Sequence, residues 1–161
     1  MESLLLEKNQ IKAVMAPVDL NTAAVTGARI NLGKADKCAI VISMGASVAA
    51  TVEFTLKQHT AASGGSSKVL SVMNPYFHKA GAATVFTKVE PTVAASVYDL
   101  SSIFAADAGI AVLEVKGEDL DVDGGYAYVS VDIAHSAAAK IGCGMYILND
   151  MRFLPAYNEV V

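Results

Sequence analysis

The sequence has 161 residues, which fits one domain that can bury a core without disulfide or metal cross-links. Its net charge of −4 and its lack of a basic cluster argue against nucleic-acid binding, and the lack of an apolar run of about 18 residues argues against a membrane span. Only 17% of the residues are charged and 53% are hydrophobic, so Ala, Val, Ser and Gly must fill much of the surface. Such a surface often lies against a protein partner, and a monomer with an Ala-rich surface is the alternative.

The N-terminal segment predicts an arm in front of a single domain. An acidic Glu2 followed by three leucines does not make a secretory signal. Residues 2–14 are expected to form a short amphipathic helix or an extended arm, and Pro17 would end any helix there. We therefore expect an arm or short helix over residues 1–16 and one β-rich domain over residues 17–161.

The first half of the domain is predicted to consist of strands. Residues 28–32 alternate between apolar and polar side chains, and residues 37–44 form a continuous apolar run typical of a strand covered on both faces. Residues 52–57 alternate strictly, which predicts a half-buried strand in an antiparallel sheet. The Ser- and Gly-rich residues 60–67 predict a hairpin tip, after which residues 68–73 resume as a strand.

The second half continues in short strands with Gly, Pro and Asp between them. The residues at 123–125 predict a hairpin turn because glycine accepts a positive φ, and residues 126–133 alternate after it. Residues 98–106 are expected to contain a helical turn, and residues 134–140 a short helix or an Ala-rich loop. Further strands are expected at residues 84–90, 110–116, 144–149 and 152–154. Eight or nine short strands without long helical crossovers predict a mainly β fold, an antiparallel sandwich or barrel with one or two short helices.

An acidic stretch is the one candidate metal site. Asp119, Asp121 and Asp123, followed by Gly124, match the start of a calcium loop, in which carboxylates at alternate positions converge on a cation. The position that needs a bidentate Glu is Ser130. Since alternate residues of a strand point the same way, an acidic solvent face leading into a hairpin is the simpler interpretation, and no metal is expected.

Catalytic and cofactor motifs are not found. His59, His78 and His135 are scattered, without a second His or a Cys at metal-ligand spacing, and there is no G-x-S-x-G sequence to present a serine nucleophile. Cys38 and Cys143 lie far apart in the sequence without CxxC spacing, which favours buried free thiols in a reducing compartment. A single disulfide bond between them is the alternative. We therefore expect no catalytic residue, no cofactor and no enzymatic activity.

Several stretches give the chain a family resemblance. They are residues 25–37, 52–59, 74–81 and 146–157. Together they resemble the small virion proteins encoded near the major capsid gene of tailed bacteriophages. The resemblance implies a head decoration (cement) protein that binds the outer capsid lattice. Its partner would be the major capsid protein and its location the capsid surface of the virion, after synthesis in the host cytoplasm. No catalytic or metal residue is implied. Lattice symmetry favours a symmetric homo-oligomer, with a trimer as the first expectation.

Three other functions stay open from the sequence. A tail-tube or head–tail connector subunit would also have a β-rich body with loops or arms. A small ligand- or calcium-binding β module would rest on the stretch over residues 119–123. A hydrolase would need the scattered Ser, His and Asp residues to meet in space.

Overall fold

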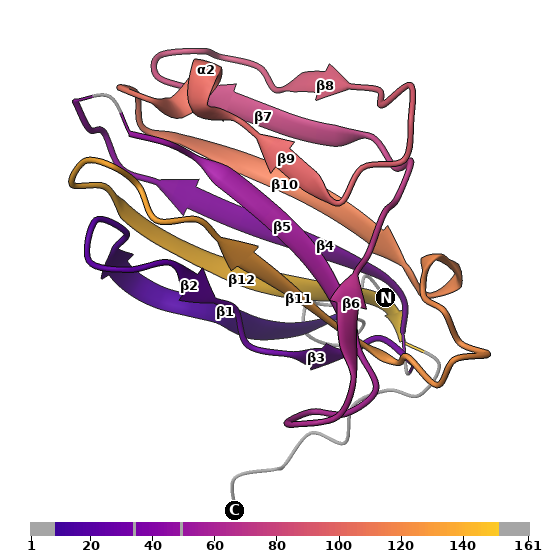
Figure 1. Ribbon diagram of the computed structural model, residues 1–161. Coiled ribbons are helices and arrows are strands. Elements are labelled where there is room, and N and C mark those ends of the chain that lie inside the picture. The colour runs from indigo at the N-terminus through magenta and orange to yellow at the C-terminus, as the bar shows by residue number, and fades with distance from the viewer. Residues whose placement is uncertain (1–8, 34, 49, 152–161) are drawn as a thin grey trace, which may run out of the picture.

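Two antiparallel sheets pack face to face as a sandwich in the computed structural model, which describes residues 9–33, 35–48 and 50–151 (Figure 1). Sheet A has the strand order β1 (Gln10–Asp19), β12 (Ile141–Met151), β4 (Ala35–Met44), β10 (Gly109–Lys116), β7 (Tyr76–Ala80) and β8 (Thr87–Val89). Sheet B has the order β2 (Val25–Thr26), β11 (Tyr128–Ile133), β5 (Glu53–His59) and β6 (Ser67–Val69), with β3 (Ile30–Asn31) on β11 and β9 (Val97–Asp99) on β5. A short helix, α2 (Ser101–Phe104), and a 3-10 turn, η1 (Gly117–Asp119), complete the described elements. The predicted mainly β antiparallel fold is confirmed, and of its two alternatives, sandwich and barrel, the structure is the sandwich. No described helix has the length and apolar character that a membrane span requires.

The inner faces of the two sheets supply the core, as the predicted alternation requires. Phe54 and Leu56 on β5, and Val52 directly before it, are each 0% exposed. The matching buried residues are Ala111, Leu113 and Val115 on β10, and Val129, Val131 and Ile133 on β11. Side chains two apart on a strand share one face, so each strand contributes a row to the core. Burying one such Val, Leu or Phe side chain stabilises the fold by roughly 1.5–3 kcal/mol.

Tyr146 connects the two sheets through a gap in the pairing of β11. β2 and β3 pair with different parts of β11. Between these two parts, the Tyr146 hydroxyl forms a hydrogen bond to the backbone of β11. It donates to the Ala28 carbonyl oxygen at 2.8 Å and accepts from the Val131 N–H at 3.2 Å. Beside it, Gly27 N–H donates to the Val131 oxygen at 3.0 Å, and a Cβ on Gly27 would lie 2.2 Å from that oxygen. Only glycine fits this close approach.

Lys140 holds together the loops at one end of the sandwich. Its side chain is 1% exposed, and Nζ donates to the carbonyl oxygens of Gly45 at 2.9 Å, Phe104 at 2.6 Å and Asp107 at 3.2 Å. Burial lowers the pKa of Lys140, and the nearby Asp107 carboxylate opposes that shift. Three carbonyl acceptors satisfy the three donors of one ammonium group, which is the condition for burying it.

Part of the predicted N-terminal arm lies in a strand of sheet A. Residues 10–16 belong to β1, which pairs with β12, so the expected boundary at residue 17 falls inside a strand. Pro17 is tolerated because β1 is an edge strand and the register shifts between Met15 and Val18. The part of the predicted arm at residues 1–8 lies outside the described residues.

The hairpin predicted at residues 123–125 is wrong, although the turn itself is present. Gly125 has a φ of +79°, and Tyr126 N–H donates to the Asp121 oxygen at 3.0 Å. The turn joins sheet A to sheet B, because β10 pairs with β4 and β7 whereas β11 pairs with β5. Turn chemistry is local and does not decide which strands pair. The hairpin tip predicted over residues 60–67 is confirmed between β5 and β6.

Three smaller predictions can be compared with the structure. The expected helical turn is α2, where Asp99 Oδ1 accepts from Ser101 N–H at 2.9 Å. Residues 134–140 form a loop rather than a helix. The strand expected at residues 152–154 lies outside the described residues.

Candidate protein-binding face

The acidic stretch does not gather its carboxylates around one point. Asp119 Oδ2 accepts from Asn74 Nδ2 at 2.6 Å and from Lys116 N–H at 2.7 Å. Asp121 pairs with Lys68, and this hydrogen bond is the main cause that lowers the pKa of Asp121. Asp123 lies on an exposed turn. Within the described ranges, no three His, Cys, Asp or Glu side chains are grouped as metal ligands.

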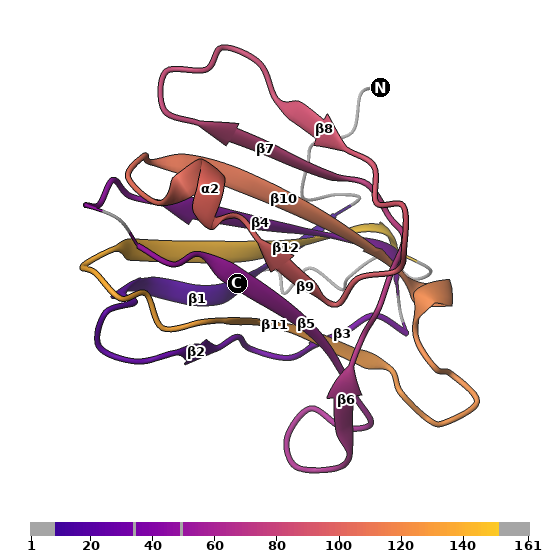
Figure 2. The same ribbon diagram turned by 45° about the horizontal axis from the view of Figure 1, so that its top comes forward.

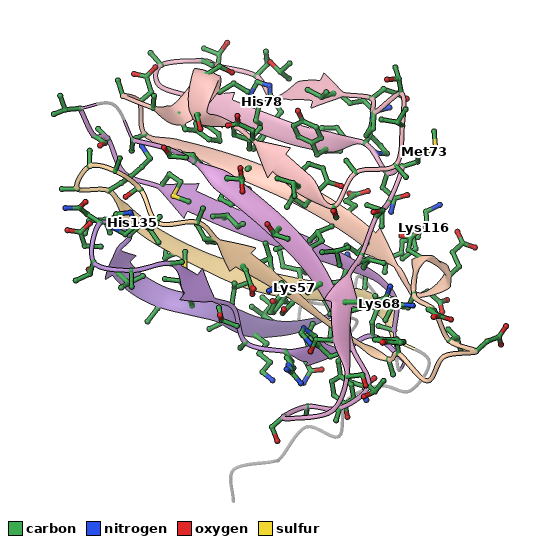
Figure 3. All side chains as sticks on the ribbon, viewed as in Figure 1. Lys57, Lys68, Met73, His78, Lys116 and His135 are labelled. Atoms are coloured by element: carbon green, nitrogen blue, oxygen red, sulfur yellow. The ribbon has the colours of Figure 1, made fainter. Side chains whose placement is uncertain are left out.

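The three histidines lie apart, as Figure 3 shows for His78 and His135. His59 is 3% exposed and sits between two serine hydroxyls, with Nδ1 2.6 Å from Ser67 Oγ and Nε2 2.8 Å from Ser130 Oγ. Burial is the main cause that lowers the pKa of His59. The second partner of the imidazole is therefore a hydroxyl where a catalytic triad places a carboxylate. This chain of hydrogen bonds links β6, β5 and β11 to one another within sheet B.

The outward-facing side of sheet A is apolar across five strands. Its apolar side chains, here called the outer face, are Ile11 and Ala13 on β1, Ile141, Cys143, Met145 and Ile147 on β12, Ala39 and Val41 on β4, Ile110 and Val112 on β10, and Phe77 on β7. One unbroken cross-strand row runs through Ala13, Met145, Val41, Val112 and Phe77. Figure 2 shows these strands as one layer on the side away from β5 and β11.

The described part of the chain leaves this face open to solvent. Ile11 is 40% exposed, Ile141 53% and Met145 43%. Five strands at about 4.8 Å spacing and six residues at about 3.4 Å rise give a face of roughly 24 Å by 20 Å, or about 500 Å². The largest apolar patch of a typical monomer covers roughly 300–600 Å² and often has a function. The outer face is therefore a candidate binding surface.

The outward side of sheet B has the opposite character. Glu53, Thr55 and Lys57 point outward from β5, and Lys57 Nζ lies 2.7 Å from Asp132 Oδ2 on β11. Antiparallel sheets commonly have one apolar face and one solvated face, and sheet B follows that rule. Sheet A is apolar on both faces, so its outward side is the exception in this sandwich.

The sequence contains one indication of this face, an apolar run on β4, and we expected that run to be buried inside the domain. The run over residues 37–44 was expected to be covered on both faces. Ile40 and Ile42 are 0% exposed, but Ala39 and Val41 on the other side are only half-buried. Apolar residues at both parities of a strand indicate that both sides avoid water, without indicating whether the same chain covers both.

The two cysteines also lie on opposite sides of sheet A. Cys38 is buried, and burial raises its pKa to about 12. Cys143 is half-buried within the outer face. Both are free thiols as expected, but only Cys38 is buried.

Comparisons with known proteins give little beyond this geometry. No protein-family model and no curated protein matches the sequence. Among solved structures, the SPBc2 prophage-derived protein YomS is similar with a TM-score of 0.44 and 12% sequence identity, over 86% of this chain and 92% of that chain. A likeness of this extent carries no inference about function.

Proposed function

We propose that this protein is a non-enzymatic structural subunit of a tailed-phage virion, a head decoration protein that binds the outer capsid lattice and stabilises the head. The observation that carries the proposal is the apolar outer face of sheet A, with Ile141 53% and Met145 43% exposed in the single chain. An open apolar patch of this size often has a function, and contact with another molecule is the function that an apolar surface suits. The resemblance to small virion proteins supports the capsid as that partner.

The size of the face fits a protein that acts in many copies. A stable one-to-one complex buries about 800 Å² on each partner, and the outer face supplies about 500 Å². One copy therefore binds weakly by itself. Copies that link neighbouring capsomers gain avidity, and they stabilise the shell by mass action because they bind only its assembled form. A symmetric trimer on the capsid surface is part of the proposal.

The test uses shells assembled from the major capsid protein of the phage that encodes this chain. Shell melting is measured with wild-type protein, with a Val41→Gln/Val112→Gln variant and with a Thr55→Gln/Val97→Gln variant. Val41 and Val112 are a cross-strand pair in the outer face, and Thr55 and Val97 are a cross-strand pair in sheet B. The second variant is therefore a matched control for the first. Circular dichroism confirms that both variants fold.

Wild type and the sheet B variant are expected to raise the melting temperature of the shell, and the outer-face variant to leave it unchanged. A shell that wild type does not stabilise contradicts the proposal. Rings or tubes of the purified protein in negative stain would support a tail-tube or connector subunit in its place.

A further inference from the structure

The charges that border the outer face are balanced among themselves. By register, the charged side chains on the outward side of sheet A are Lys37, Lys79, Lys88, Lys116, Glu114 and Asp19. Lys88 Nζ lies 2.5 Å from Glu90 Oε1, and Lys116 Nζ lies 3.2 Å from Glu118 Oε1. Four lysines, three glutamates and Asp19 give this border a net charge of 0, whereas the whole chain carries −4. The other residues of the sequence therefore carry the whole net charge of −4.

This balance leaves apolar contact as the main attraction at the outer face. Its central row, from Ala13 to Phe77, contains no charged side chain. The ammonium groups of Lys88 and Lys116 already have carboxylates beside them, and such exposed pairs contribute little and are screened by salt. Electrostatic steering needs potentials of opposite sign on the two partners, and a near-neutral border does not provide one.

The shape and chemistry of the face exclude other kinds of partner. Proteins that lie on anionic membranes combine Lys and Arg with protruding Trp, Phe and Leu, whereas Phe77 is the one aromatic side chain among the eleven of the outer face. Nucleic acids require a strongly positive surface. A second copy would bury about 1,000 Å² in total, below the roughly 1,200 Å² of a stable pair.

We infer that the partner of the outer face is a flat apolar protein surface with a near-neutral border, repeated on a lattice, and that shape and apolar contact, rather than charge, select it. The inference rests on the proposed function for the identity of that lattice. The proposed trimer uses other surfaces of the chain than this one.

The first experiment measures binding of the full chain to the capsid shells at about 50 and about 500 mM NaCl, where the Debye length falls from about 14 to about 4 Å. The dissociation constant is expected to rise by less than about threefold at the higher salt concentration, or to fall, because apolar association does not weaken with salt. Lys79→Gln/Lys88→Gln removes two border charges, and Lys57→Gln/Lys68→Gln, which removes two charges from strands of sheet B, is the matched control. Neither is expected to weaken binding more than about threefold.

Two further measurements use the protein alone. Sedimentation velocity at about 20 μM is expected to give the same oligomeric state for wild type and for Val41→Gln/Val112→Gln, because the outer face does not form a dimer. Sedimentation with vesicles of phosphatidylserine and phosphatidylcholine is expected to leave the protein in solution.

The outcomes separate the inference from the proposed function. Tenfold weaker shell binding at high salt, or in the Lys79/Lys88 variant alone, overturns the inference and leaves the proposed function standing. Vesicle binding, or a dimer that the outer-face variant abolishes, also overturns the inference. Shells that bind no wild-type protein at either salt concentration overturn the proposed function, and the sedimentation and vesicle results then decide the inference.

Discussion

Replacing Tyr146 by Phe removes one oxygen atom from the middle of the sandwich. In the native protein that hydroxyl donates to the Ala28 oxygen at 2.8 Å and accepts from the Val131 N–H at 3.2 Å, at a site that is 0% exposed. Phe fills the same space, so no cavity forms, but a carbonyl and an N–H lose their partner. Each buried group left without a partner costs about 1–3 kcal/mol. With partial relief by an entering water, we expect a loss of about 2–3 kcal/mol in the free energy of unfolding.

Urea unfolding followed by far-UV circular dichroism measures this loss, and thermal unfolding is expected to shift down by about 5–10 °C. Tyr126→Phe is the control, because the ring that lies 4.4 Å from Lys68 Nζ is retained. The control is expected to change stability by less than about 0.5 kcal/mol. If Tyr146→Phe also stays within about 0.5 kcal/mol of wild type, the hydroxyl does not hold the two sheets together as described.

Three further changes test other contacts. Gly27→Ala places a Cβ 2.2 Å from the Val131 oxygen and is expected to cost about 3 kcal/mol or more in urea unfolding. Lys140→Met leaves three carbonyl oxygens without their ammonium donor and is expected to cost about 2–4 kcal/mol in the same assay. Since burial lowers the pKa of His59 below its ordinary 6.5, the unfolded chain takes up this proton first. Stability is therefore complete above pH 6.5 and falls as the pH is lowered toward the folded-state pKa, and His59→Gln is expected to flatten that fall.

Each of these tests has a result that refutes its contact. A Gly27→Ala protein within about 1 kcal/mol of wild type would mean that the strands can separate at little cost. Lys140→Met with unchanged stability would remove the lysine from the forces that hold the loops. For His59, the unfolding series is kept above about pH 5.5, where lowered carboxyl pKa values such as that of Asp121 contribute little. Equal slopes in wild type and His59→Gln would contradict the assignment.

The sequence predicts the strands of this fold better than it predicts their partners. A strand buried on one side has apolar residues at every second position, and residues 52–57 and 110–116 show this alternation. It can therefore be recognised from the sequence alone. The turn at residues 123–125 is equally legible because Gly125 needs a positive φ. The sequence does not show that this turn joins two sheets, because the pairing of β11 with β5 depends on residues far away in the sequence.

The sequence predicts even less of the candidate site. The outer face requires residues from five strands to line up in one row, from Ala13 on β1 to Phe77 on β7. Single-strand patterns show only that β4 has apolar residues on both sides. The inter-sheet bond of Tyr146 had no sequence signal either, because the gap it fills lies between β2 and β3.

The central claim is that the outer face of sheet A is the surface by which this protein binds. Cys143 lies in that face as a half-buried thiol, and Cys38 is a buried internal control whose pKa is raised to about 12. Alkylation of both thiols by iodoacetamide can be followed by mass spectrometry in free and shell-bound protein. Binding is expected to slow the modification of Cys143 by about tenfold or more, because a covered thiol is no longer accessible, with Cys38 unreactive throughout. Equal rates for Cys143 in free and bound protein would contradict the claim.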